Sequence, residues 1–348
     1  MMDNRDLSAA EAEAATGAFL HWHGIATFLR CPYRPDMSET DIGLIGFPYS
    51  GGNFVERMQY LGPRAVRNRS AAYRRRLRGV DVDPFAVCRI SDLGDVPVAD
   101  ALTPDLAVQA QQAFYERVDA AGIIPVTVGG DHSVTTPILR AIAGPRSRRG
   151  QPIGMIHFDA HSDTYPAAQG TRHHAGAAFR IGVEEGLIDP ARTVQIGFRG
   201  PIGHPNQDAW SQDHFTIIPY DDIVAKGPDW AASEIRGVIG DGPTYLSFDV
   251  DVLDPAYAPA VADPEVEGLT SREFFTILNG IRGIDLVGAD VVCFCPPLDN
   301  PAQTTALLIS QFLLVACSLI AERRASHDRG DADRKLVLER STSAAAVG

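Results

Sequence analysis

Short apolar runs rich in β-branched residues recur along the chain, and glycine, proline or charged residues bound each run. In IIPVTVGG and PIGMIHFD, apolar residues occupy both odd and even positions. Such continuous runs are typical of strands that are buried on both faces, as in a parallel sheet. The pattern predicts strands at 41–48, 123–130, 152–159, 193–199, 243–251 and 286–294.

Segments with helical periodicity separate the expected strands. The segment 103–122 has Thr103 as its expected N-cap, and in 270–283 the spacing of Thr270 and Glu273 is that of a capping box. Strand and helix alternate about six times, which is the pattern of a sheet covered by helices. We therefore predict an α/β fold with a mostly parallel sheet, covered on both faces, in one domain.

The two ends of the chain differ from this alternating region. Residues 1–40 are expected to form an N-terminal arm with some helix, and residues 41–323 the main domain. The end, 324–348, is rich in polar and small residues, which predicts a loose tail or an arm that docks on a neighbour.

Composition and charge narrow the class of protein. With 348 residues, 45% of them apolar, the chain can bury a large core. We expect no membrane partner, because no run approaches the roughly 18 to 20 apolar residues that a span needs, and the N-terminus lacks a signal-peptide pattern. A cytoplasmic protein is therefore expected. The net charge of −13 disfavours nucleic acid and favours cationic ligands. Five cysteines without framework spacing predict free, buried thiols.

Acidic and histidine side chains gather where three of the expected strands end. They are Asp131 and His132 in GGDHS, Asp159, His161 and Asp163 in DAHSD, and Asp249 and Asp251 in SFDVD. Ligands of open α/β sheets bind at the carboxyl ends of strands, and alternate residues project to the same side. We therefore expect these side chains to converge.

The carboxylates among these residues would repel one another and take up protons unless positive charge lay between them. Two divalent cations supply that charge. An oxygen-rich set with imidazole and without thiolate suits Mn²⁺ or Ni²⁺ better than Mg²⁺ or a structural Zn²⁺. A single aspartate at a strand end is more often a cap, and a single histidine is more often a core residue. The three motifs together favour a two-metal site.

GGDHS, DAHSD and SFDVDVLDPAYAP resemble the three signature motifs of the ureohydrolases, the family of arginase, agmatinase, guanidinobutyrase and formimidoylglutamase. The resemblance runs from about residue 41 to about residue 320, and 186–200 and 269–275 are most similar to the agmatinase branch. It implies a three-layer α/β/α sandwich, a homo-oligomer (trimer or hexamer), and a hydroxide that bridges two metal ions. That hydroxide would attack the carbon of a guanidinium group.

The resemblance also implies roles for single residues. One ion would be held by His132, Asp159, Asp163 and Asp249, and the other by Asp159, His161, Asp249 and Asp251, so that Asp159 and Asp249 bridge. One nitrogen of the substrate must be protonated before it leaves. His174 is the candidate proton shuttle because the family has a histidine here, and Asp131 is placed beside it among the catalytic candidates. The family's His-Gly pair reads His-Ala-Gly in this chain, so His173 remains an alternative.

The chain departs from the family's pattern where the substrate would bind. The glutamate expected to hold the guanidinium group is Cys293, and the loops 259–264 and 56–67 are rewritten. Losing a carboxylate removes a charge-assisted hydrogen bond of roughly 1.5 to 3 kcal/mol. The pattern therefore favours a bulkier or less cationic substrate, an N,N-dialkylated guanidine or a biguanide, as in a metformin-hydrolase-type enzyme.

Three alternatives stay open at this point. Agmatinase or guanidinobutyrase activity, releasing urea, could proceed through an altered pocket. A non-catalytic subunit could assemble with an active paralogue, although such a subunit has no reason to keep a set of mutually repelling ligands; an active subunit could also need such a partner. Finally, Cys293 and Cys295 could be buried strand cysteines with no chemistry.

Overall fold

The computed structural model describes residues 24–54, 58–99 and 102–345, and beyond residue 326 it gives only the course of the last helix. One sheet of parallel strands forms the centre of the molecule, in the order β2-β1-β3-β8-β7-β4-β5-β6. The strands are β1 Ile42–Gly46, β2 Ile90–Asp95, β3 Ile124–Val128, β4 Ile153–Phe158, β5 Ile188–Ile196, β6 Thr216–Ile218, β7 Thr244–Asp249 and β8 Leu286–Val292.

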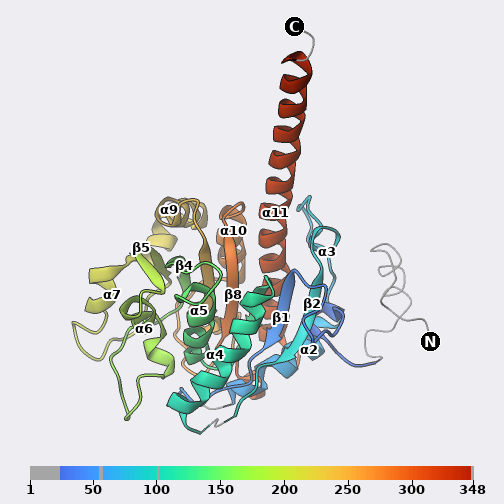
Figure 1. Ribbon diagram of the computed structural model, residues 1–348. Helices are drawn as coiled ribbons and strands as arrows, with labels where there is room; N and C mark the ends of the chain where they lie inside the picture. The colour runs from blue at the N-terminus through green and yellow to red at the C-terminus, as the bar shows by residue number, and fades with distance from the viewer. Residues whose placement is uncertain (1–23, 55–57, 100–101, 346–348) are drawn as a thin grey trace.

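Helices lie on both sides of this sheet (Figure 1), which confirms the predicted three-layer α/β/α sandwich. The α-helices are α2 Gly62–Ser70, α3 Pro84–Val87, α4 Pro104–Ala120, α5 Thr135–Ala143, α6 Ala178–Glu184, α7 Ala209–His214, α8 Tyr220–Lys226, α9 Pro228–Ile239, α10 Ser271–Gly280 and α11 Thr304–Ala345. Short 3-10 helices are η1 Phe28–Arg30, η2 Gln59–Leu61, η3 His132–Val134, η4 Ala175–Ala177, η5 Val250–Val252 and η6 Pro296–Leu298.

Two buried hydrophobic clusters hold the layers together. One includes Ile235 of α9, Phe274 of α10 and Phe312 of α11, and the other includes Phe114 of α4 and Phe179 of α6. Alternate residues of a strand point to opposite faces of a sheet, and β4, β7 and β8 each contribute residues to both clusters. This double burial explains why the strands read as continuous apolar runs.

Two strands escaped prediction. β6 has three residues at the edge of the sheet, too few for a pattern. β2 reads ISDLGD, and its Asp92 is fully buried. Arg67 makes that burial tolerable, because its Nε lies 2.8 Å from Asp92 Oδ2 and its Nη1 lies 2.6 Å from Asp95 Oδ1. Because Arg67 is distant from β2 in the sequence, the residues of β2 read on their own as a polar segment and not as a buried strand.

The caps of two helices test the expected helix starts. The capping box at Thr270 is present, with Thr270 accepting from the Glu273 N–H and Glu273 accepting from the Thr270 N–H. Thr103 lies at the N-cap of α4 but makes no capping hydrogen bond. Pro104 follows it, and the fixed φ of a proline already suits the first helical position.

The last helix, α11, corrects two expectations. It continues unbroken past residue 323, where the sequence predicts a tail, and extends away from the sheet (Figure 1). Its first part, Thr304–Ser326, is long and apolar enough to cross a membrane by length and composition, so the statement that no run approaches this limit is wrong. Of its most apolar window, 83% is buried inside the protein, as in a core helix. Docking of the tail on a neighbour stays a prediction.

The N-terminal arm is described only from residue 24 onwards, and the predicted helix before that point lies outside the described residues. Its described part is anchored to the domain. Phe28 and Leu29 of η1 are buried, and the Phe28 N–H donates to Asp92 Oδ2 over 3.0 Å. The Arg67 guanidinium lies over the Phe28 ring, 4.2 Å from its centroid.

The sheet order positions the candidate site. β3, β8, β7 and β4 are consecutive neighbours at the centre of the sheet, and all run in the same direction. Their carboxyl ends therefore meet at one edge. The motifs GGDHS and DAHSD follow β3 and β4, SFDVD spans the end of β7, and Cys293 follows β8.

Candidate metal centre

The structure brings all six predicted metal ligands together at this edge of the sheet. We call His132, Asp159, Asp163 and Asp249 the inner group, and Asp159, His161 and Asp251 the outer group. In the inner group, His132 Nδ1 lies 3.2 Å from Asp159 Oδ2, 2.9 Å from Asp163 Oδ2 and 3.2 Å from Asp249 Oδ2. In the outer group, His161 Nδ1 lies 3.1 Å from Asp251 Oδ2 and 3.3 Å from Asp159 Oδ1.

The hydrogen bonds of His132 decide which of its nitrogens is free. The Ser247 hydroxyl has one proton, which it donates to Asp290 Oδ1 over 2.7 Å. The Nε2 of His132, 2.8 Å from Ser247 Oγ, must therefore be the donor in that contact. Although burial opposes it, the three carboxylates around Nδ1 raise the pKa of the His132 ring well above its usual value, so without a cation Nδ1 carries a proton. A bound cation would take the place of that proton, and the neutral ring would then turn the lone pair of Nδ1 toward it. This nitrogen is fully buried and has no hydrogen-bond partner, so a cation fits between it and the carboxylates.

Three carboxylates of the two groups, Asp249, Asp251 and Asp163, also indicate that positive charge belongs here. Burial raises the pKa of Asp249, and the charges of Asp251 and Asp159 raise it further. Burial and the charge of Asp159 also raise the pKa of Asp251, and raise that of Asp163 to about 6. Without bound cations these carboxyl groups keep their protons to a higher pH than usual, whereas divalent cations would hold them ionised. The donor set, imidazole nitrogen and carboxylate oxygen, suits divalent transition metals.

Asp159 joins the two groups. Its Oδ2 faces His132 and its Oδ1 faces His161. Asp249 is linked to the outer group through the backbone, because Asp249 Oδ1 accepts from the Asp251 N–H over 3.0 Å. The Ala160 N–H in turn donates to Asp251 Oδ1 over 3.0 Å. These contacts suit the bridging positions expected for Asp159 and Asp249, and the ligand roles remain predictions.

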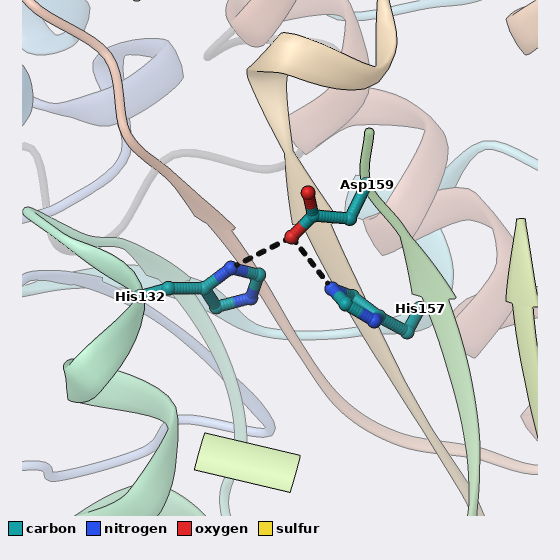
Figure 2. A group of neighbouring side chains, drawn as sticks. All are labelled: His132, His157 and Asp159. Atoms are coloured by element: carbon teal, nitrogen blue, oxygen red, sulfur yellow. Dashed lines mark hydrogen bonds and ion pairs between the residues drawn. The ribbon is translucent and has the colours of Figure 1, made fainter. Parts of the chain in front are cut away.

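His157 belongs to the site although the sequence analysis gave it no role. Burial lowers its pKa to about 4, so the ring is neutral. Its Nδ1 accepts from Gln195 Nε2 over 2.8 Å, and its Nε2 therefore donates to Asp159 Oδ2, also over 2.8 Å. Figure 2 shows His132 and His157 approaching the same oxygen of Asp159. His157 thus fixes the orientation of Asp159. The sequence could have indicated this role, because His157 comes two residues before Asp159 and alternate residues of a strand project to the same side.

The comparison with known proteins assigns the family. A model of the arginase family matches residues 40–318. The chain belongs to the arginase family. This arginase-family protein is 43% identical to the guanidinopropionase of Pseudomonas aeruginosa over 304 residues, 87% of this chain and 93% of that one. It is 35% identical to the human mitochondrial guanidino acid hydrolase over 297 residues, 85% of this chain and 83% of that one.

A solved structure shares the whole fold. Proclavaminate amidino hydrolase from Streptomyces clavuligerus superposes with a TM-score of 0.83 at 33% identity, covering 88% of this chain and 100% of that one. Together with the family match, this likeness confirms the resemblance drawn from the three motifs and the prediction of a hydrolase of this family.

Asp131 of this arginase-family protein lies beside the cluster but does not face it. Its Oδ1 accepts from the Ser133 N–H over 2.9 Å, and its Oδ2 accepts from the Gly52 N–H over 2.8 Å. It therefore caps η3 and ties the loop at Gly52 to the edge of the sheet. Burial raises its pKa. The geometry supports a positioning residue, while the catalytic role stays a prediction.

The two candidate histidines have different surroundings. His173 uses both ring nitrogens, because Nδ1 lies 2.5 Å from Asp105 Oδ1 and Nε2 lies 3.0 Å from Arg140 Nη2. His174 is buried, and its Nε2 donates to the Pro166 carbonyl over 3.0 Å, which leaves Nδ1 as its acceptor. Within the described residues, no hydrogen bond or ion pair joins either histidine to the six ligands.

Cys293 lies at the inner group. Its side chain, a nitrogen of His132 and a carboxylate oxygen of Asp249 all lie within 4.8 Å of one another. In two other groups of side chains in the described residues, the possible ligand atoms lie equally close together. These groups are His132 with His157 and Asp159, and Asp159 with His161 and Asp251. The position predicted to contact the substrate is therefore in contact with the metal centre.

Proposed function

We propose that the protein hydrolyses a C–N bond of a small guanidino compound with the help of two divalent cations, Mn²⁺ or Ni²⁺. The ligands would be His132, Asp159, His161, Asp163, Asp249 and Asp251. The observation that carries the proposal is the buried Nδ1 of His132, which has no hydrogen-bond partner and lies 2.9 to 3.2 Å from oxygens of three carboxylates. When bound, such a pair of cations lowers the pKa of a shared water enough to supply hydroxide at neutral pH.

The chain's own residues hold this arrangement and handle protons. His157 and Gln195 keep Asp159 in one orientation between the two groups. The departing nitrogen must gain a proton, and His174 is the proposed shuttle. Its hydrogen bond to Pro166 leaves Nδ1 without a proton, so Nδ1 would first accept a proton released by the attacking water and then pass it to the departing nitrogen. His173 is less suited because both its nitrogens are already engaged.

The relatives favour a guanidino substrate, since their names are guanidinopropionase, guanidino acid hydrolase, guanidinobutyrase and agmatinase. A second candidate is a substituted guanidine or a biguanide. The observation that favours it is that Cys293, and not a carboxylate, lies beside the metal centre, because a carboxylate here would be desolvated against alkyl groups it cannot pair with. We propose the unsubstituted guanidino compound as the primary substrate class.

A release assay on protein reconstituted with Mn²⁺ or Ni²⁺ tests these proposals. The panel would contain guanidinopropionate, guanidinobutyrate, agmatine, arginine, N,N-dimethylguanidine and metformin, with urea and free amine measured separately. We expect urea from an unsubstituted member and no turnover after chelation. Turnover confined to the dialkylated compounds would support the second candidate, and turnover in protein free of metal would contradict the mechanism.

The assembly and location of the protein stay proposals as well. We propose a homo-oligomer, a trimer or hexamer, with a hetero-oligomer containing a paralogous subunit as the alternative, and a location in the cytoplasm. Light scattering on the purified chain alone, combined with the release assay, tests the first point. An inactive chain that gains turnover only with a second subunit would favour the hetero-oligomer.

A further inference from the structure

Cys293 occupies a central position among the candidate ligands because of the sheet order. β8 lies between β3 and β7, so the first residue after β8 lies between His132, which follows β3, and Asp249, which ends β7. Asp249 is in register with Val292, the last residue of β8. The Cys293 N–H donates to the Gly130 carbonyl over 2.7 Å, which fixes the backbone at this point.

The backbone of Cys293 is unusual. Its φ of 65° lies in the left-handed region, which a residue with a Cβ seldom adopts. Asp163 of the inner group has a similar φ of 48°, but aspartate is among the residue types enriched there. Strained conformations of this kind cluster at functional sites, where the surrounding structure maintains them.

A second observation at the same place points to a ligand. The Cys293 side chain is 8% exposed, and its sulfur shares a volume less than 4.8 Å across with a nitrogen of His132 and an oxygen of Asp249. His132 Nδ1 is fully buried and lacks a hydrogen-bond partner. Nitrogen, oxygen and sulfur donors this close together form a donor set that can bind a metal ion.

We infer that Cys293 Sγ is an additional ligand of the cation held by the inner group. This inference rests on the proposed two-metal function and concerns the choice of metal. On binding, the S–H proton leaves to solvent and the thiolate lone pair forms the bond to the cation. A thiolate is a soft donor, so the inner position would favour Ni²⁺, Co²⁺ or Zn²⁺ over Mn²⁺.

Cys295 provides a matched control. It lies two residues further along, is fully buried, and belongs to none of the ligand groups found within the described residues. Its backbone N–H donates to the Ala260 carbonyl over 2.8 Å, on the loop 259–264. Both cysteines are therefore buried and close in sequence, and they differ in their proximity to the inner group.

The test is the absorption spectrum of the full chain loaded with Co²⁺ or Ni²⁺ alone. We expect a thiolate-to-metal charge-transfer band in wild type and in Cys295→Ser, and its loss in Cys293→Ser and Cys293→Ala. Titrations should show Ni²⁺ affinity at the inner position reduced by about ten-fold or more in Cys293→Ser, a loss at least as large as those of outer-shell changes. Mn²⁺ affinity should change less, since a hard ion gains little from sulfur.

The outcomes separate this inference from the function on which it rests. Wild type that binds two cations and releases urea without a charge-transfer band would overturn the role of Cys293 and leave the proposed function standing. A band that survives in Cys293→Ser would also overturn it. A chain that binds neither ion would overturn both. Circular dichroism of each variant checks folding, and the wild-type spectrum decides the question even where a variant fails to fold.

Discussion

The inner and outer groups use the same kinds of side chain in different surroundings. The His132 ring is fully buried and is supported from behind by Ser247 and Asp290. The His161 side chain is 28% exposed, and its Nε2 lies 3.9 Å from Glu265 Oε1 at the rim. Burial strengthens electrostatic attraction and restricts water. We therefore expect a cation in the inner group to bind more tightly and to exchange more slowly than one in the outer group.

The largest effect should come from removing the residue that both groups share. Asp159→Asn should remove both cations and reduce turnover by about a thousand-fold or more, because the mechanism needs both ions. Elemental analysis of the dialysed protein gives the metal content per chain. Asp119→Asn, at a buried aspartate of α4, is the matched control and should retain both ions. If Asp159→Asn still retained two cations per chain, the proposal that the inner and outer groups share Asp159 would be wrong.

Separate replacement of the two histidines should distinguish the groups. His132→Ala should weaken the tighter of two binding steps, and His161→Ala the looser one, each by about 10- to 100-fold or more. Calorimetric titration of metal-free protein resolves the two steps. Ion binding to the native state also adds stability, about 2.7 kcal/mol per ion at 100 times its Kd, so the Tm of His132→Ala should fall further. If both variants weaken the same binding step to the same extent, the two histidines do not serve separate cation positions.

A smaller effect on metal binding is expected from Gln195, which supports Asp159 through His157. Gln195→Leu removes the donor to His157 Nδ1, which allows the ring to change tautomer and lose its hydrogen bond to Asp159. Metal affinity should fall by about ten-fold, as for other outer-shell changes. Gln111→Leu, at a buried glutamine of α4, controls for the loss of a buried amide. Unchanged affinity in Gln195→Leu would mean that packing alone orients His157.

The smallest effect is a pH dependence of the metal-free protein. Asp163 has a folded pKa of about 6, above its usual value, so the folded state binds more protons than the unfolded state between about pH 4 and pH 6. Its contribution to stability is present below pH 4 and lost as the pH rises through 6. Metal-free wild type should thus lose Tm relative to Asp163→Asn over this range. Bound cations should abolish the difference, and parallel curves without metal would contradict the raised pKa.

The sequence located the strand ends and the acidic and histidine motifs that follow them, because local spacing carries that information. It did not reveal the sheet order. Cys293 and His132 are far apart in the sequence, and only the placement of β8 beside β3 brings them together. The prediction of a donor set without sulfur therefore considered only the three motifs and left out the residue that follows β8.

Other features depended on partners that are distant in the chain. Asp92 reads as a loop residue until Arg67 is found beside it. His157 reads as part of an apolar strand until Gln195, on β5, fixes its tautomer. The tail at 324–348 has the composition of a loose segment, yet its backbone continues α11 to Ala345. For Asp92 and His157, tertiary context outweighed local composition.

The central position of β8 also constrains how the protein folds. β3 and β7 cannot be joined until β8, residues Leu286–Val292, is inserted between them. During synthesis the chain emerges from its N-terminus, so this strand becomes available only after most of the protein has been made. Pairings between such distant segments are slow to form, because a long loop must be closed before any contact rewards it. The two halves of the sheet therefore cannot be joined before β8 has been made, and only then do the ligands that follow β3 and β7 come together.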